Sequence, residues 1–361
     1  MKTKPPIYVT MPSLPPLAEY MEVLEGPWAS GVLTHHGPLV QRLERELQEL
    51  LRLEHLVAVT NGTVALQLAI RALGVEGEVL TTPFSWIATC SAIQWQGCRP
   101  KFVDIDPETF NIDVAKLEEA ITDETSAILA VHVFSNPCDV EAIARIADRR
   151  NLKVIFDAAH AMCVSYKGRS LLEYGDVSGT SFHATKLFNT GEGGACVTTD
   201  GDVAGRLRRM RFFGHDEEKQ IVDVGMNGKM TEVHAALGLA NLKRLDAVLK
   251  KRRAIYDAYR NGLAAVDWVS FQKIDPEAYN YSYMPVVFED EDRLSEVLRK
   301  LVEEQIHARR YFYPALNTIN AVSEYTAMPN AEALAKRILC LPSYDRLSLE
   351  QVGSICRIVA G

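Results

Sequence analysis

Between residues 55 and 200, short runs of aliphatic and β-branched residues alternate with segments of helical periodicity. The apolar runs predict strands at residues 56–60, 78–81, 101–105, 127–131, 154–157 and 195–198. The helical patterns occupy residues 63–73, 85–96, 113–121 and 140–149. Strands that alternate with helices in this way build a mostly parallel sheet with helices on both faces. The pattern therefore predicts an α/β fold.

The chain is long enough, at 361 residues, for more than one average domain. Residues 229–264 read as a single long helix, with Thr231 as its N-cap and apolar positions that include Val233 and Leu237. This helix leads into a smaller α+β region that reaches Gly361. We expect a large domain at residues 1–245 and a small domain at residues 246–361, packed closely because no long linker separates them.

The composition is that of an ordinary soluble protein, with 47% hydrophobic and 24% charged residues. A net charge of -8 argues against a general nucleic-acid surface, and the apolar runs are too short to span a membrane. Residues 1–6 carry charges but no apolar run follows them, so no secretory signal is expected. Seven cysteines without a C-x-x-C pair suggest reduced thiols in the cytoplasm. We expect no metal site, and we interpret residues 44–49 as a solvated face.

Asp157 and Lys186 are the strongest candidates for chemistry. The apolar run before Asp157 brings this carboxylate to the end of a strand, where ligands of parallel sheets bind. A lysine that follows the next strand can reach the same crevice. An amine that forms a Schiff base and an anion that keeps a pyridine ring protonated are the pair required by pyridoxal phosphate. Alone, the aspartate is equally well a helix cap and the lysine a surface residue.

Four further residues fit a flat, phosphorylated ligand. Gly62 and Thr63 lie between a strand and a helix, where free N–H groups hold phosphates. Trp86 can stack on a ring, and Ser181 can donate its hydroxyl to a phosphate. The alternatives are a capped turn, a core aromatic residue and a strand-end serine.

Together these segments resemble the DegT/DnrJ/EryC1/StrS family of sugar aminotransferases, which are fold-type-I pyridoxal phosphate enzymes with a parallel sheet and a smaller C-terminal domain. The resemblance covers nearly the whole chain, through the segments at residues 37–40, 60–66, 83–89, 102–106, 157–160, 181–194, 310–314 and 338–342. It includes the Asp-Ala-Ala-His element at Asp157 and the Lys186 segment. Each match is weak alone, and their order along the chain makes the set specific.

The resemblance implies a role for each matched residue. Lys186 would form the Schiff base and move protons, and Asp157 would pair with the ring nitrogen. His160 would lie near the ring and its hydroxyl. Trp86 would stack on the ring, while Gly62, Thr63 and Ser181 would hold the phosphate.

Asn227 would reach the phosphate of a neighbouring subunit, which implies a homodimer with shared active sites. The sequence departs from the family here, since Gly228 and Lys229 stand where Tyr and Arg are commoner. Lysine cannot reproduce a bidentate arginine contact, so a substrate-binding role for Lys229 does not carry over. His183 is expected to orient the lysine loop.

The segments around Lys186 and Asn227 resemble the subgroup that aminates carbon 4 of dTDP-4-keto-6-deoxyglucose. We therefore expect transfer of an amino group from L-glutamate to this nucleotide sugar, for aminosugar and polysaccharide biosynthesis. Arg309, Arg310, Tyr311 and Tyr313 offer cations and aromatic faces for the substrate, or else form an exposed basic helix end.

Four other functions share some of these sequence features. A sugar 3-aminotransferase of the same family remains the main alternative, and a non-catalytic pyridoxal phosphate regulator is a further one. A related dehydratase would carry histidine in place of Lys186. A nicotinamide enzyme would need a G-x-G-x-x-G segment after the first strand, which is missing.

Overall fold

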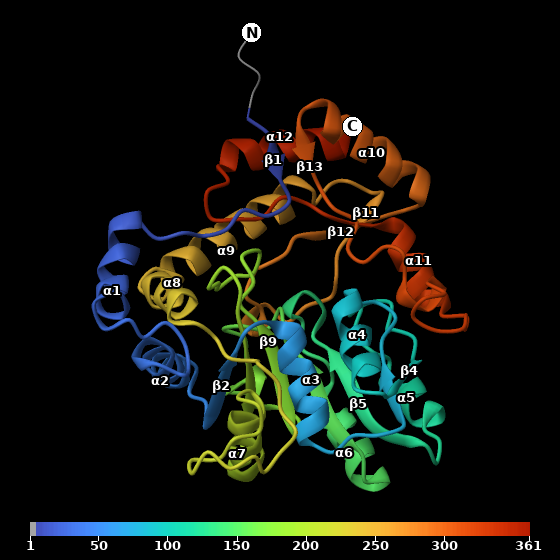
Figure 1. Ribbon diagram of the computed structural model, residues 1–361. Coiled ribbons are helices and arrows are strands. Elements are labelled where there is room, and N and C mark those ends of the chain that lie inside the picture. The colour runs from blue at the N-terminus through green and yellow to red at the C-terminus, as the bar shows by residue number, and fades with distance from the viewer. Residues whose placement is uncertain (1–4) are drawn as a thin grey trace.

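The computed structural model describes residues 5–361, and residues 1–4, which entered the expectation about a secretory signal, lie outside it. Within the described residues, seven strands form the central sheet in the order β2-β10-β9-β6-β5-β3-β4 (Figure 1). The strands are β2 (His55–Val59), β3 (Glu78–Thr81), β4 (Arg99–Phe102), β5 (Thr125–Val131), β6 (Lys153–Asp157), β9 (Val177–Ser181) and β10 (Gly194–Thr198). Among these, β10 alone runs in the direction opposite to the other six. The predicted mostly parallel sheet is confirmed.

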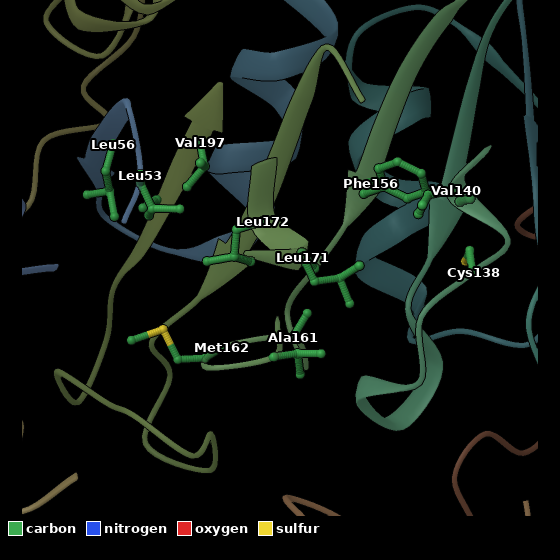
Figure 2. Packing of buried hydrophobic residues seen from close by; sticks show 14 of the residues in the cluster. Leu53, Leu56, Cys138, Val140, Phe156, Ala161, Met162, Leu171, Leu172 and Val197 are labelled. Carbon is green, nitrogen blue, oxygen red and sulfur yellow. The ribbon is translucent and has the colours of Figure 1, made fainter. Parts of the chain in front are cut away.

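Helices cover both faces of this sheet. Successive side chains of a strand point to opposite faces, so each strand contributes apolar residues to both. In β2, Leu56 and Ala58 join one apolar cluster while Val57 and Val59 join another. The first cluster, part of which Figure 2 shows around Leu56 and Phe156, takes side chains from α2 (Pro38–Leu51), α5 (Val114–Ala120), α6 (Val140–Arg150) and α8 (Glu232–Leu242). The second takes them from α3 (Gly62–Ala72), α4 (Ile87–Trp95) and α7 (Gly201–Met210). Helix α1 (Leu17–Ser30) packs beside α8.

The C-terminal part has its own apolar cluster and an antiparallel sheet of β11 (Val269–Ser270), β12 (Pro285–Phe288) and β14 (Ile338–Cys340). Its helices are α9 (Leu245–Gly262), α10 (Glu291–Glu303), α11 (Pro329–Arg337) and α12 (Leu349–Ala360). The N-terminal strand β1 (Ile7–Tyr8) also lies here, paired in parallel with β13 (Ile306–His307). A short hairpin, β7 (Ser165–Tyr166) and β8 (Arg169–Ser170), follows β6.

The single helix expected at residues 229–264 is wrong. Thr231 does cap a helix, since its hydroxyl accepts the His234 N–H at 3.3 Å, but α8 ends at Leu242 and α9 begins at Leu245. No glycine or proline marks this break. The break lets α8 pack against α1 and α2, while α9 runs from the first apolar cluster at Leu245 into the C-terminal cluster at Ile255. The domain division at residue 245, next to the break, remains a prediction.

Glu44 also corrects an expectation, because it is buried rather than part of a solvated face. It is 7% exposed, and its carboxylate accepts the Ala58 N–H at 2.8 Å and pairs with Arg211 at 2.5 Å. The other carboxylate oxygen lies 2.8 Å from Nε2 of His36. Glu44 therefore joins α2 to β2 and to the end of α7.

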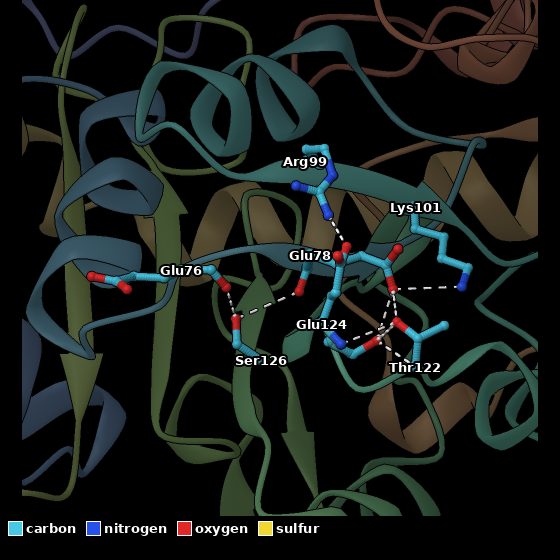
Figure 3. Close-up of polar contacts among 8 residues, drawn as sticks. Glu76, Glu78, Arg99, Lys101, Thr122, Glu124 and Ser126 are labelled. Carbon is cyan, nitrogen blue, oxygen red and sulfur yellow. Dashed lines mark hydrogen bonds and ion pairs between the residues drawn. The ribbon is translucent and has the colours of Figure 1, made fainter.

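A polar network closes the sheet at the amino ends of β3, β4 and β5 (Figure 3). Glu78 accepts hydrogen bonds from Thr122 at 3.0 Å and Thr125 at 2.8 Å, and Arg99 pairs with Glu124. These contacts hold the end of the sheet opposite to the carboxyl ends of the strands, which remain available for a ligand.

Among residues 5–361, no helix combines the length and the apolar character needed to cross a membrane. The same residues contain no group of three or more His, Cys, Asp or Glu side chains arranged to hold a metal ion. The seven cysteines are free thiols, and all except the half-buried Cys163 are buried.

Candidate active site

A cavity of about 480 Å³ opens where β2, β6 and β9 reach their carboxyl ends. This is the position at which parallel sheets bind ligands. Side chains from the C-terminal part close the cavity from the other side. Its lining includes Gly62, Thr63, Trp86, Asp157, His160, Ser181, Lys186, Tyr283, Arg309, Tyr311 and Phe312.

Asp157 is the last residue of β6, and this residue is only 7% exposed. The Thr89 hydroxyl donates to Oδ2 at 2.7 Å, and the Ala159 N–H donates to Oδ1 at 3.1 Å. Burial raises the pKa of Asp157, and these hydrogen bonds together with the Lys186 charge only partly oppose that effect. The carboxylate is thus held in place by neutral donors, and a positively charged ligand atom would stabilise its ionised form.

Lys186 stands in a folded loop between β9 and β10. Backbone hydrogen bonds shape this loop, including Lys186 N–H to the His183 carbonyl and Ala184 N–H to the Gly191 carbonyl, each at 2.8 Å. The Nδ1 of His183 lies 2.8 Å from the Thr185 hydroxyl within this loop. The Lys186 amine lies 3.2 Å from the phenol oxygen of Tyr283. Burial lowers the pKa of Lys186, which favours the neutral amine.

His160 is half-buried among aromatic rings. Its Nδ1 accepts the Phe134 N–H at 3.2 Å, so the proton of the neutral ring belongs on Nε2. The imidazole is nearly parallel to the rings of Phe134 and Phe312, whose centroids each lie 6.1 Å from its own. The centroid of the Tyr283 ring lies 4.4 Å away. Burial holds the pKa of His160 well below its usual range. His160 therefore offers a neutral donor to a ligand in the cavity.

The turn from β2 into α3 supplies free backbone donors. Asn61 caps α3 by accepting the Val64 N–H at 2.9 Å, which leaves the N–H groups of Gly62 and Thr63 without a partner inside the helix. Gly62 has no room for a side chain, because a Cβ there would lie 2.8 Å from the Ser181 Cβ. The helix terminus and the Ser181 hydroxyl consequently lie side by side, as an anion site requires.

Trp86 and Arg309 form the rim of the cavity. Trp86 is 51% exposed, and its ring meets that of Tyr311 edge-on at 6.4 Å. The Arg309 guanidinium lies 5.3 Å from the Trp86 centroid and 4.7 Å from that of Tyr311. An exposed ring and an adjacent cation suit a flat or anionic ligand.

The other predicted substrate residues lie farther out. Arg310 and Tyr313 line a neighbouring cavity of about 520 Å³, which shares Trp86, Arg309 and Tyr311 with the first. Arg310 pairs with Glu291 at 2.7 Å and donates to the Lys336 carbonyl at 3.0 Å, so its guanidinium also joins α10 to α11.

Asn227 does not line the cavity of its own chain. It pairs with Phe212 in an isolated β-bridge and accepts a hydrogen bond from Lys229. The Lys229 amine lies 4.7 and 4.6 Å from the ring centroids of Phe212 and Phe213.

Sequence reasoning missed several residues of the cavity or its wall, among them Thr89, Tyr283 and Phe312. Thr89 follows Trp86 by three positions, so helical spacing could have indicated a shared face. Tyr283 comes from the C-terminal part, and nothing near it in the sequence points to Lys186.

The comparisons with known proteins agree with one another. Residues 18–360 match the model of the DegT/DnrJ/EryC1/StrS aminotransferase family. The chain is 45% identical to a dTDP-4-amino-4,6-dideoxy-D-glucose transaminase of Shigella dysenteriae, over 98% of both chains. It is 40% identical, with the same coverage, to an Escherichia coli protein of that name. Among solved structures, DesI crystallised in the presence of its TDP-sugar product superposes with a TM-score of 0.94 at 34% identity, covering 99% of this chain and 93% of DesI.

Proposed function

The chain belongs to the DegT/DnrJ/EryC1/StrS aminotransferase family, and we propose that it transfers the amino group of L-glutamate to dTDP-4-keto-6-deoxy-D-glucose. The product would be dTDP-4-amino-4,6-dideoxy-D-glucose. The observation that carries the choice of sugar is the 45% identity to the Shigella dysenteriae transaminase over 98% of both chains. Asp157, Lys186 and Arg309 give the cavity an acid, a base and a cation that are compatible with this chemistry.

Pyridoxal phosphate is the proposed cofactor, and the residues of the cavity fit it. Asp157 is a buried carboxylate whose hydrogen-bond partners are neutral, which suits a protonated pyridine nitrogen. The N–H groups at the start of α3 and the Ser181 hydroxyl suit the phosphate. Trp86 offers an exposed ring face for stacking. When bound, the cofactor supplies a carbon that carries the amino group and a ring that accepts electrons from a breaking carbon–hydrogen bond.

Lys186 and His160 would serve this chemistry in different ways. The lowered pKa of Lys186 favours its neutral amine, which can accept a proton and return it. His160 would donate from Nε2 and keep its ring fixed through the Phe134 hydrogen bond and the aromatic stack. The loop at residues 181–194 would hold Ser181 and Lys186 in fixed positions relative to Asp157.

Arg309 and Tyr311 would bind the sugar nucleotide at the rim, because a guanidinium pairs well with phosphate oxygens. Arg310 and Tyr313 would extend the site through the adjoining cavity. Asn227 would complete the phosphate site of a second copy, which makes the enzyme a homodimer. Large exposed apolar side chains close to Asn227 in the chain, namely Phe213, Ile221 and Val224, support a protein-covered surface there.

The test is an assay of purified protein with L-glutamate and a panel of ketosugars. We expect 2-oxoglutarate to form in step with dTDP-4-amino-4,6-dideoxy-D-glucose, identified by NMR, and no product with Lys186→Ala. The panel should include a dTDP-3-ketosugar and GDP- and UDP-linked 4-ketosugars. Turnover of the 3-keto compound alone would replace the substrate, and cofactor binding without any turnover would favour a regulator.

A further inference from the structure

We propose that Tyr283 is the positioning residue for Lys186, its phenol oxygen holding the amine whenever this lysine is not joined to the cofactor. The inference rests on the proposed function in taking Lys186 as the residue that moves the proton. It starts from the 3.2 Å separation between the lysine Nζ and the tyrosine oxygen. Tyr283 comes from the segment before β12, far from Lys186 in the sequence, and reaches the cavity from the C-terminal side.

The chemistry of the two groups suits this role. A protonated lysine has three donors and no acceptor, whereas a phenol both accepts and donates. Tyr283 can therefore accept from the ammonium form and donate to the neutral amine, so the lysine stays oriented in both states. Asp157, as a carboxylate, can only accept. A proton carrier needs such a fixed direction, because proton transfer requires hydrogen-bond geometry to the reacting atom.

The segment that carries Tyr283 is fixed on several sides. Asn280 donates to the carbonyls of His160 at 2.7 Å and Met162 at 2.8 Å. The guanidinium of Arg252, which is 1% exposed, donates to the Ser282 carbonyl at 3.0 Å. Tyr281 adopts the left-handed region with φ of 57°, a conformation that persists only where the surroundings determine it. These contacts tie the position of Tyr283 to the chain that carries Asp157 and His160.

The ring of Tyr283 is also held in place. It lies 5.3 Å from the Phe134 centroid and meets Tyr311 edge-on at 6.1 Å. Burial raises the pKa of Tyr283, so its phenol keeps the proton across the working pH range. The other titratable or charged side chains that line the cavity around Lys186 are Asp157, His160, His183, Glu192, Arg309 and Tyr311.

The direct test measures the pKa of Lys186 in cofactor-free, full-length protein. The rate of acetylation of Lys186 by trace acetic anhydride would be followed against pH by mass spectrometry of its peptide. A hydrogen bond to a charged donor is about twice as strong as a neutral one, so Tyr283→Phe should destabilise the ammonium form. We expect the acid dissociation constant of Lys186 to rise about tenfold, which is a fall of about one unit in its pKa.

Tyr259→Phe is the matched control, because it also removes a buried phenol, one that donates to the Pro342 carbonyl at 2.9 Å away from the cavity. It should leave the labelling curve of Lys186 unchanged. An unchanged curve in folded Tyr283→Phe would overturn the proposal. If Tyr283→Phe does not fold, Tyr283→Gln and Tyr283→Met give the same comparison. The Gln variant keeps an acceptor and should show the higher Lys186 pKa, and equal values would again contradict the proposal.

A kinetic measurement on the holoenzyme separates positioning from binding. Tyr283→Phe should lower kcat about tenfold while both KM values change less than about twofold, since the hydroxyl acts through the lysine. A rise in KM with unchanged kcat would overturn the positioning role. The labelling experiment needs no turnover. A shifted Lys186 pKa in a protein that aminates no sugar would therefore reject the proposed function while the role of Tyr283 stands.

Discussion

Asp157 combines burial with two hydrogen bonds from neutral donors. Burial alone would favour the protonated acid, so the Thr89 hydroxyl and the Ala159 N–H keep the ionised form accessible and correctly oriented. A cationic ring nitrogen would remove the remaining cost of burying the charge. The function of this residue therefore depends on its charge more than on its size.

Asp157→Asn should keep the fold and lose activity on the order of a hundredfold or more, about 3 kcal/mol of barrier. The amide is nearly isosteric, but it cannot stabilise a protonated pyridine. The measurement is kcat with L-glutamate and the preferred ketosugar, beside circular dichroism and cofactor absorbance. Turnover near that of the wild type in a folded, cofactor-loaded variant would show that the carboxylate has another role.

Residues at the ends of strands, or just after them, were predictable from the sequence, because the position of the strand determines theirs. Asp157, Ser181 and Gly62 are of this kind, and the cavity contains all three. Tyr283 was not predictable, since its approach to Lys186 depends on how the C-terminal part packs on the sheet. Arg310 was predicted as a ligand residue, but the sequence did not indicate that its guanidinium also joins two helices.

At the level of elements, the close approach of α3 to β9 depends on Gly62. Gly62→Ala would bring a methyl group to 2.8 Å from the Ser181 Cβ, so the start of α3 or the end of β9 must move. We expect the affinity for pyridoxal phosphate to fall about tenfold or more, because the N–H groups and the Ser181 hydroxyl would no longer converge. Affinity can be measured by absorbance titration of cofactor-free protein.

Gly205→Ala serves as the control, since Gly205 lies inside α7 and a Cβ there would lie 3.6 Å from its nearest neighbour, Nη1 of Arg209. Alanine should stabilise this helix by about 0.5–1 kcal/mol and leave cofactor affinity unchanged. Equal affinities in the two variants would mean that the α3 terminus does not contribute to the phosphate site.

Element types were predictable where periodicity is local, as in the run from β2 to β6. The break between α8 and α9 was not, because Lys243 and Arg244 are ordinary helix formers. Arg244 pairs with Glu19 of α1 at 2.6 Å, a contact that no sequence window contains. The burial of Glu44 could not be predicted for the same reason, since its partner Arg211 is far away in the chain.

Glu44→Gln should destabilise the protein by about 3–5 kcal/mol at neutral pH, because Arg211 would remain buried without a counter-charge. Urea unfolding measures this, with Glu46→Gln as the control. Glu46 pairs with Arg42 on the exposed side of α2, so its loss should cost under about 1 kcal/mol. Similar losses in the two variants would contradict the structural role of Glu44.

The pH dependence of the Glu44 contribution has a definite sign. Burial pushes the pKa of Glu44 upward, but the hydrogen bond from His36 and the charge of Arg211 outweigh it and lower the pKa overall. A carboxyl with a lowered pKa in the folded state stabilises the protein above its unfolded pKa and loses this contribution as the pH falls. The difference between wild type and Glu44→Gln should therefore shrink below about pH 4.

At the scale of the whole molecule, residues from both parts of the chain line the cavity, and Asn227 is not among them. Strand β1 pairs with β13 of the C-terminal part, so the two parts are joined there as well as through the connection between α8 and α9. Asn227 instead lies on the surface near exposed Phe213 and Val224. This arrangement is the one expected if a second copy of the chain receives Asn227.

A mixing experiment tests the shared site. Lys186→Ala and Asn227→Asp chains are each expected to be inactive, the first without the amine and the second with a carboxylate that repels the phosphate. In a mixed dimer, one of the two sites contains intact Lys186 and intact Asn227. Mixing the variants under conditions that exchange subunits should therefore restore up to about a quarter of the wild-type activity, since half of the dimers are mixed and each has one complete site. Exchange must be checked separately, by mass spectrometry of differently tagged chains. If tagged heterodimers form and recover no activity, each subunit builds its site alone, and Asn227 acts within its own chain.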